Sequence, residues 1–209
     1  MKFLLSLLAA AASFGCSALP AVSYEIYREN MPMSIVVLPP LEETIEVGVS
    51  YDYLSTLTRP LAERGYYVFP PAMVASMLRE NGLPTPFEMH QASPAKLREV
   101  FGADAALYVT LEAWGTRFRV IQSVTEVEVS AQLVDLESGI AIWEGETRQT
   151  QVSGGVSLLG RVAGAVVAQV AGNVSDRALR LADQVNTALF YSKSRGLLRG
   201  PLHPLYEGL

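Results

Sequence analysis

Cysteine and histidine are nearly absent from this sequence of 209 residues, which has one cysteine, Cys16, and two histidines, His90 and His203. A single cysteine cannot form a disulfide within the chain, so burial of apolar surface and hydrogen bonding must stabilise the fold. Zinc sites are built mainly from cysteine and histidine, and the two histidines lie far apart in the sequence. We therefore expect no disulfide and no metal site.

Positive charge is also scarce. The chain has 16 Lys and Arg residues against 21 Asp and Glu residues, which gives a formal net charge of −5 at pH 7. An acidic chain with scattered cations is not typical of a nucleic-acid-binding protein, so we expect no nucleic-acid partner. With 50% hydrophobic and 18% charged residues, the composition is that of a globular protein rather than a disordered one.

Catalytic motifs are missing too. The segment that comes nearest to the Gly-x-Ser-x-Gly motif of serine hydrolases is residues 155–159, which lack the second glycine. No glycine-rich loop followed by Lys and Ser or Thr occurs, so nucleotide hydrolysis has no support. Paired carboxylates are a feature of acid–base catalysis, but the pairs in this chain fall in a loop and on two solvent-facing strands. These pairs are Glu42 and Glu43, Glu126 and Glu128, and Glu144 and Glu146.

Two further titratable residues have structural interpretations. Asp104 directly precedes a predicted strand, where a turn or cap residue is expected. His90 lies in a segment flanked by prolines and is interpreted as a surface histidine. Because no catalytic constellation is found, we predict that the protein is not an enzyme and holds no cofactor.

The clearest functional signal is in residues 1–17. Lys2 is followed by an apolar run, by small residues and then by Cys16, which is the order found in an export signal. The apolar run is shorter than the about 20 residues that a membrane-spanning helix needs. A cysteine directly after the segment Ser13–Gly15 resembles the lipobox of a bacterial lipoprotein.

This lipobox resemblance implies cleavage before Cys16 and acylation of that residue, which would anchor the domain to the lipid bilayer. The alternative is an ordinary secretory signal with a chance cysteine near the cleavage site. An unpaired thiol is unusual in an exported protein, which favours lipidation. Ser17 takes the position at which lipoproteins of the inner membrane typically carry Asp, so the resemblance favours the outer membrane.

We divide the sequence into four parts. Residues 1–15 are the signal peptide, 16–33 a lipidated tether, 34–191 a single folded domain and 192–209 a C-terminal tail. Removing the signal peptide leaves 194 of the 209 residues, enough for one domain with a substantial core. Because Lys2 is removed as well, 15 basic residues remain against 21 acidic ones, a formal net charge of −6.

The first half of the domain alternates strands with helices. Strands are predicted at residues 34–38 and 66–69, and helices at residues 50–64, 72–81 and 94–101. Pro60 is expected to kink or split the first helix, and Gly65 to form its C-terminal cap. This order of elements favours right-handed crossovers and partly parallel strand pairing.

The second half of the domain predicts an antiparallel meander. A strand is expected at residues 105–111, another begins at Phe118, and strict alternation over residues 126–133 indicates a strand with one buried face. Residues 135–139 are a hairpin turn that leads into a strand at residues 140–146. The predicted fold class is therefore α/β, a mixed parallel and antiparallel sheet flanked by helices, with a long C-terminal helix.

That C-terminal helix is predicted over residues 156–190, and part of it carries a stripe of small residues. Gly160, Gly164, Ala168 and Gly172 recur every four positions, a spacing that lets two helix backbones approach closely. One interpretation is a helix-packing interface for self-association, and the other is a helix that lies tightly on the sheet. Polar residues such as Arg161 interrupt the apolar run, so we do not expect a membrane span.

Six segments carry a family resemblance: Ile35–Pro40, Tyr53–Thr56, Leu61–Pro70, Phe101–Val109, Leu133–Asp135 and Ile142–Glu144. Together they resemble a family of bacterial lipoproteins of unknown function found in envelope transport-type gene clusters. The resemblance covers nearly the whole mature chain. It implies a fold like that of the N-terminal domain of TolB and of the periplasmic domain of CsgG, the curli secretion lipoprotein. The family supplies no catalytic residues, so only the lipidated Cys16 is carried over.

Our first hypothesis is therefore a non-enzymatic outer-membrane lipoprotein that faces the periplasm and forms a homo-oligomer. It would act as a protein-binding or scaffold subunit of an envelope transport or assembly system. Its binding surfaces would be the small-residue helix, the sheet edges and the loops at residues 42–48 and 84–93. One alternative is a CsgG-like secretion-pore subunit, which requires hairpins with about 9–11 residues per strand. Another is an outer-membrane activator of peptidoglycan synthesis.

Overall fold

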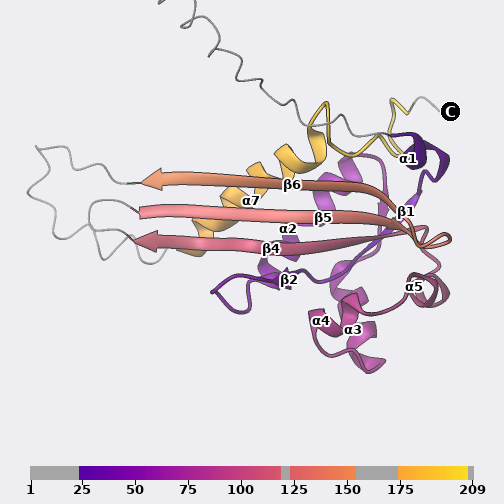
Figure 1. The fold of residues 1–209 in the computed structure, drawn as a ribbon, viewed down its shortest axis with the longest axis horizontal. Helices are drawn as coiled ribbons and strands as arrows, with labels where there is room; N and C mark the ends of the chain where they lie inside the picture. Colours follow the sequence, from indigo (N-terminus) through magenta and orange to yellow (C-terminus); the bar gives the residue numbers. More distant parts are fainter. Residues whose placement is uncertain (1–23, 119–122, 154–173, 207–209) are drawn as a thin grey trace, which may run out of the picture.

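A six-stranded mixed sheet forms the centre of the computed structural model, which describes residues 24–118, 123–153 and 174–206 (Figure 1). The strands are β1 (Ser34–Val37), β2 (Leu41–Glu42), β3 (Tyr67–Val68), β4 (Ala105–Phe118), β5 (Ser123–Asp135) and β6 (Ala141–Ser153). Their order is β3-β1-β4-β5-β6, and β2 pairs with β4 further along. Strand β1 runs parallel to β3 and β4, whereas β4, β5 and β6 form an antiparallel meander. The predicted mixed sheet is confirmed.

Helices cover both faces of this sheet. They are α1 (Glu25–Glu29), α2 (Ser50–Glu63), α3 (Pro71–Glu80), α4 (Pro86–His90), α5 (Pro94–Phe101) and α7 (Val174–Tyr191). Helices α2 and α7 pack on one face, against each other and against the meander. Helices α3, α4 and α5 pack on the other face, over β1 and the start of β4.

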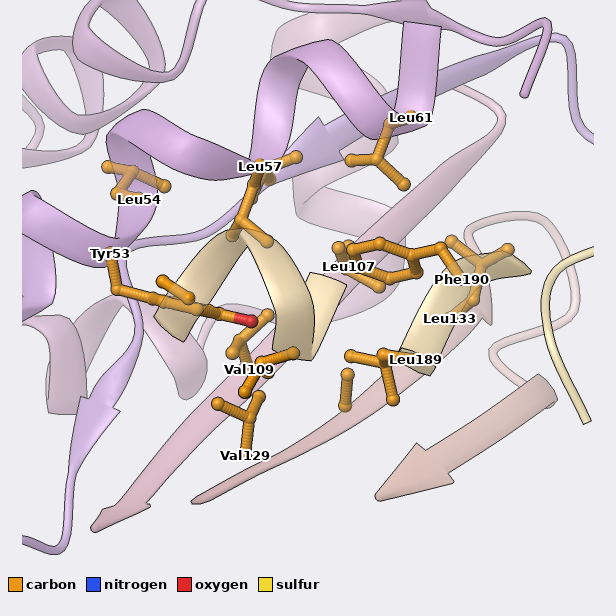
Figure 2. Close-up of a cluster of buried hydrophobic side chains, with 14 of the residues drawn as sticks. Tyr53, Leu54, Leu57, Leu61, Leu107, Val109, Val129, Leu133, Leu189 and Phe190 are labelled. Atoms are coloured by element: carbon orange, nitrogen blue, oxygen red, sulfur yellow. The ribbon is translucent and has the colours of Figure 1, made fainter. Parts of the chain in front are cut away.

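The larger core lies between the sheet and the α2–α7 layer (Figure 2). The side chains of Tyr53, Leu57 and Leu61 project from α2 at the helical spacing that the sequence predicts, and all three are fully buried. Helix α7 adds Ala178, Leu181, Val185 and Leu189. The sheet contributes alternate residues of β4 and β5, among them Leu107, Val109, Val129 and Leu133.

The smaller core lies on the opposite face and covers only one end of the sheet. Val36 of β1 and Leu38, directly after the strand, point into it, in alternation with the residues that face the larger core. Val74 and Leu78 of α3, Met89 of α4 and Leu97 of α5 complete it. Beyond this cluster, the same face of the meander carries polar side chains, and no helix of the described residues covers it.

Pro60 lies within α2, yet the helix is continuous from Ser50 to Glu63, so the predicted split does not occur. A proline has no N–H to donate, which leaves the carbonyl group of Thr56 without its helical partner. Asn186 of α7 supplies the missing donor, since its Nδ2 lies 3.2 Å from Thr56 O and 2.9 Å from Thr56 Oγ1. The Oδ1 atom of Asn186 accepts a hydrogen bond from the hydroxyl group of Tyr53 at 2.7 Å. Burial raises the pKa of Tyr53 well above its ordinary value, so this hydroxyl remains a donor.

Gly65 ends α2 as predicted, with a φ angle of +89°. The N–H of Tyr66 bonds to the carbonyl group of Leu61, and the N–H of Gly65 to that of Ala62, which is the Schellman arrangement. The segment after α7 packs on this turn: an added Cβ at Gly65 would lie 2.5 Å from His203 Cβ. Backbone hydrogen bonds join Gly200 N to Arg64 O and Leu202 N to Gly65 O. The predicted tail is thus a packed part of the domain.

Asp104 has the structural role expected of it. Its Oδ2 atom accepts hydrogen bonds from the backbone N–H groups of Met33 and Ser34 at 3.1 and 2.9 Å, and from Ser34 Oγ at 2.8 Å. Ser34 Oγ accepts a bond from the N–H of Asp104 in return, at 3.0 Å. The pair therefore joins the start of β1 to the start of β4.

Two predicted boundaries differ from the structure. Residues 24–33 were assigned to the tether, but α1 lies there and its Tyr27 side chain is fully buried, with its hydroxyl 2.7 Å from that of Tyr66. The strand expected to begin at Phe118 is instead the end of β4. An irregularity between Leu111 and Ala113 shifts the register of β4 by one residue, which interrupts the alternation that the prediction relied on.

Other sequence-based expectations fall outside the described residues. Cys16 and the small-residue stripe of Gly160, Gly164, Ala168 and Gly172 are among them, so the lipidation site and the helix-packing interface stay predictions. The part of the C-terminal helix that is described, α7, lies on the sheet. Of the helices that the structure describes, none combines the length and the apolar character of a membrane span.

The network around Pro60 predicts a specific coupling of stabilities. We expect Asn186→Ala to lower the free energy of unfolding by about 2–3 kcal/mol, because Thr56 O and the Tyr53 hydroxyl lose a partner in a buried site. In a Pro60→Ala background, the restored N–H of residue 60 bonds to Thr56 O, so the same replacement costs about 1 kcal/mol less. Denaturant unfolding of the four chains measures this difference, and strictly additive losses would contradict the network.

The packing on Gly65 predicts unequal effects at two glycines. Gly65 and Gly82 have nearly the same φ angle, +89° and +88°, but an added Cβ at Gly82 meets no atom within 4 Å. We expect Gly82→Ala to cost about 1 kcal/mol of conformational strain and Gly65→Ala at least about 3 kcal/mol, because the latter also displaces the segment at His203. Thermal unfolding tests this, and equal losses at the two sites would contradict it.

Candidate functional site: an apolar groove beside β2

An apolar groove of about 460 Å³ lies between the loop after β2 and the start of α4. We call it the β2–α4 groove. Its lining residues are Leu41, Glu42, Glu43, Val47, Gly48, Ser50, Tyr51, Thr85, Pro86 and Phe87. The loop and the helix are far apart in the sequence and meet because β2 pairs in parallel with β4, with Leu41 opposite Thr110.

Large apolar side chains at this groove are exposed to solvent. Val47 is 91% exposed and Phe87 66%, while Ile45, from the same loop, is 84% exposed. Single exposed apolar residues are ordinary on protein surfaces, but several gathered beside a concave apolar surface are typical of a binding site. The groove is therefore the strongest candidate for a functional surface among the described residues.

Glu42 and Glu46 hold the loop that carries these side chains. The carboxylate of Glu42 accepts hydrogen bonds from the N–H of Ser50 at 2.7 Å and of Gly48 at 3.1 Å, which also satisfies the start of α2. The carboxylate of Glu46 lies against Gly115 of β4, where a Cβ atom would overlap it. Gly115 has a φ angle of +108°, which favours glycine for a second reason. The Glu42 hydrogen bonds thus close the loop on itself, and Glu46 packs its middle against β4.

Helix α4 fixes the other wall of the groove. Thr85 and Glu88 form a capping box, in which each side chain accepts a hydrogen bond from the backbone of the other residue. Met89 is fully buried in the smaller core, and His90 Nε2 donates to the carbonyl group of Pro39 at 2.9 Å. Burial lowers the pKa of His90, which favours the neutral ring at pH 7. Phe87 thus projects from a helix that is anchored on its opposite side.

The groove carries negative charge at one wall. Glu42 is engaged by the loop, whereas Glu43 is exposed and forms no ion pair with any described residue. Arg79 of α3 lies over the ring of Tyr51, with Cζ 5.6 Å from the ring centroid. A ligand of this groove would therefore meet apolar side chains flanked by one free carboxylate.

The carboxylate pairs considered in the sequence have structural roles. Arg148 forms ion pairs with Glu126 and with Glu128, the latter at 3.6 Å, on the polar face of the meander. Glu144 Oε1 accepts a hydrogen bond from Gln132 Nε2 at 2.9 Å. Within the described residues, no three His, Cys, Asp or Glu side chains gather as metal ligands would.

Part of this groove is predicted by the sequence. Its two proposed binding loops, residues 42–48 and 84–93, are the segments that the structure brings together. Tyr51 was not singled out, because the helical spacing of α2 draws attention to its buried residues, such as Tyr53 and Leu57. Helix α4 was missed as well, although the Thr85–Glu88 spacing is a capping-box signal, since three prolines nearby suggested an irregular loop.

Comparison with known proteins identifies the family. The family described as "Putative lipoprotein GNA1162-like" matches residues 22–202. The chain is 37% identical over 185 residues to "Putative lipoprotein NMB1124/NMB1162" of Neisseria meningitidis serogroup B, covering 87% of this chain and 86% of that relative. The crystal structure of lipoprotein GNA1162 from Neisseria meningitidis is similar, with 38% identity, a TM-score of 0.56, and coverage of 68% of this chain and 99% of that one.

More distant structures include a PelC dodecamer from Paraburkholderia phytofirmans, at 14% identity and a TM-score of 0.41, with 79% of this chain and 92% of that one covered. The family match spans nearly all of the described residues, and the Neisseria relative agrees with it over most of both chains. The chain belongs to the GNA1162-like family of lipoproteins.

Proposed function

We propose that this chain is a non-enzymatic, lipid-anchored protein of the cell envelope that binds a protein partner through the β2–α4 groove. The observation that carries this proposal is the exposure of Val47 and Phe87 on the two walls of one apolar groove, with the exposed Ile45 in the same loop as Val47. Membership of a lipoprotein family supports the anchor. The role is that of a scaffold subunit in an envelope transport or assembly system.

The partner's chemistry follows from the groove. Burying a Val, Ile or Phe side chain gains about 1.5–3 kcal/mol, so the three exposed side chains can supply most of the affinity of a small interface. Because Glu42 and Glu46 fix the loop before binding, little conformational entropy is lost on association. The partner segment presents apolar side chains to the groove and a Lys or Arg side chain to Glu43.

The membrane anchor in this proposal is Cys16, acylated after cleavage of residues 1–15. Ser17 supports retention in the outer membrane, with the domain in the periplasm. We also propose a homo-oligomer, in which the stripe of Gly160, Gly164, Ala168 and Gly172 packs against its copy in a second chain.

The secretion-pore alternative gains one favourable observation and one unfavourable one. Strands β4, β5 and β6 have 14, 13 and 13 residues, more than the about 9–11 that a membrane-spanning strand needs. However, the apolar face of this meander, which would have to face lipid, is packed under α7 in the larger core. The charged cluster of Glu126, Glu128 and Arg148 lies on the other face. An activator of peptidoglycan synthesis, the second alternative, would use the same groove and is distinguished by the partner's identity.

The groove predicts a position-specific cross-linking pattern in cells. A photoreactive residue at Val47 and one at Phe87 are expected to capture the same protein. The matched control position is Ile140, which is 51% exposed in the β5–β6 turn and is expected to capture nothing. We also expect Phe87→Ser to abolish capture from position 47, because the opposite wall of the groove is removed. Capture of the same protein from Ile140, or of none from either groove position, would refute the proposed binding surface.

The anchor predicts separate effects at two adjacent residues. Cys16→Ala is expected to abolish palmitate labelling and to move the protein from the membrane to the soluble fraction. Ser17→Asp is expected to keep the label but to shift the protein from the outer to the inner membrane in density-gradient fractionation. Palmitate labelling that persists in Cys16→Ala would overturn the assigned lipidation site.

A further inference from the structure

A second pocket, of about 400 Å³, lies at the other side of the domain, between α1, the end of α2 and the segment after α7. We call it the α1 pocket. Its lining residues are Tyr24, Arg28, Met31, Arg64, Tyr191, Ser192, Lys193, Gly196, Leu197, Leu198, Arg199, Leu205 and Tyr206. In Figure 1 the segment after α7 and α1 lie at the β6 side of the sheet, whereas β2 and α4 lie beyond β4.

The lining of the α1 pocket has four cations and no carboxylate, in a chain whose formal net charge is −5. The four are Arg28, Arg64, Lys193 and Arg199. None of them forms an ion pair with a carboxylate in the part of the chain that the structure describes. Cations gathered without counter-charges repel one another, so the pocket favours an anion that relieves this repulsion.

Arg64 is held by contacts on two sides. Its guanidinium lies over the ring of Tyr191, with Cζ 5.3 Å from the ring centroid, and its Nη2 donates to the carbonyl group of Leu197. Its Nε is buried without an acceptor among the described residues. Burial raises the pKa of Tyr24, whereas the positive charges of Arg64 and Arg28 lower it.

Glu63, which contacts the lining residue Tyr191, is engaged by groups outside an anion site. Glu63 accepts a hydrogen bond from the Tyr191 hydroxyl at 2.8 Å and pairs with Arg59 at 2.8 Å. Burial and the contact with Glu63 raise the pKa of Tyr191 to about 12. Glu63 does not belong to the lining of the α1 pocket, so it does not compete with an anion there.

The pocket's backbone wall is held in place before any ligand binds. The Tyr24 hydroxyl donates to Gly196 O at 2.7 Å, and the Tyr66 hydroxyl donates to Leu198 O at 2.7 Å. Trp143 Nε1 donates to Arg195 O at 2.8 Å. These bonds fix the segment that carries Lys193 and Arg199, which lowers the entropic cost of binding.

We propose that the α1 pocket binds a phosphate ester, as carried by the headgroup of an anionic lipid. Guanidinium groups bind phosphate oxygens through paired N–H donors, and a volume of about 400 Å³ is in the range of small-molecule sites. Tyrosine rings beside the cations supply surface for the glycerol or sugar that the ester joins.

The position of the pocket in the chain supports a lipid source for the phosphate. Tyr24 follows Cys16 by eight residues, and an extended chain of eight residues reaches at most about 29 Å. The α1 pocket is therefore within a short distance of the lipid headgroups if Cys16 is acylated. This part of the inference rests on the proposed anchor, whereas the chemistry of the pocket does not.

The test uses the chain from residue 16 with Cys16→Ser, so that no acyl chain contributes to binding. Its affinity is measured for phosphatidylcholine vesicles with and without phosphatidylglycerol, at fixed ionic strength, and for inorganic phosphate by titration calorimetry. The pocket variant is Arg28→Gln with Lys193→Gln and Arg199→Gln, three exposed residues that leave the Arg64 contacts intact. We expect it to bind phosphatidylglycerol vesicles about 100-fold more weakly.

The matched control is Lys96→Gln with Arg98→Gln and Arg180→Gln, which changes the net charge equally at exposed sites outside the pocket. It is expected to bind within twofold of the starting chain. A third outcome is that the starting chain binds inorganic phosphate, only the pocket variant loses this binding, and phosphatidylglycerol vesicles are not preferred. That outcome would support the pocket and assign it to a soluble phosphate ester. Equal losses in both variants, or no binding of either probe, would overturn the proposal. Circular dichroism confirms that each variant is folded.

Discussion

Pro60 leaves the carbonyl group of Thr56 without a helical partner, and the side chain of Asn186 donates a hydrogen bond to it. This contact fixes α2 and α7, the two helices of the larger core, against each other. Apolar packing alone allows neighbouring helices to slide, since many registers bury similar area. The Asn186 side chain must reach both the carbonyl group of Thr56 and the hydroxyl group of Tyr53, and only one register of the two helices allows this. Because α7 is placed in this way, the chain leaves it at Tyr191 beside Arg64 and turns across the end of α2. The core thus determines where the C-terminal segment lies.

The domain presents two different surfaces on this frame. The β2–α4 groove is apolar and is formed by the loop after β2 and the start of α4. The α1 pocket is cationic and is formed mainly by the segments at the two ends of the described chain. Hydrogen bonds hold the segments that form both surfaces, from Glu42 and Thr85 at the groove and from Tyr24 and Tyr66 at the pocket. An anchored protein with one surface for its partner and another for the membrane can fix the distance and orientation between the two, which suits a scaffold better than a catalyst.

Local signals in the sequence predicted local structure well. The end of α2 at Gly65 is confirmed because it depends on a short run of residues, and the family resemblance is confirmed because six such runs each carry part of it. The errors have non-local causes. Strand β4 continues past Leu111 because pairing with β5 compensates for its bulge, and α1 joins the domain because Tyr27 meets Tyr66. Both walls of the groove were identified as exposed loops, but their meeting depends on β2 pairing with β4. The α1 pocket draws its cations from three separate parts of the chain, so no sequence pattern indicates it.

Tyr24 and Tyr206 line the same pocket, so the chain enters and leaves the described structure at one place. A tag or fluorescent protein fused to the C-terminus would therefore lie beside the segment that leads to the proposed anchor, and would cover the cations there. Insertion into the turn at Ile140 avoids this, because that turn is exposed and contributes to neither surface. The same proximity permits a circular permutant, with the old ends joined by a short linker and new ends at this turn.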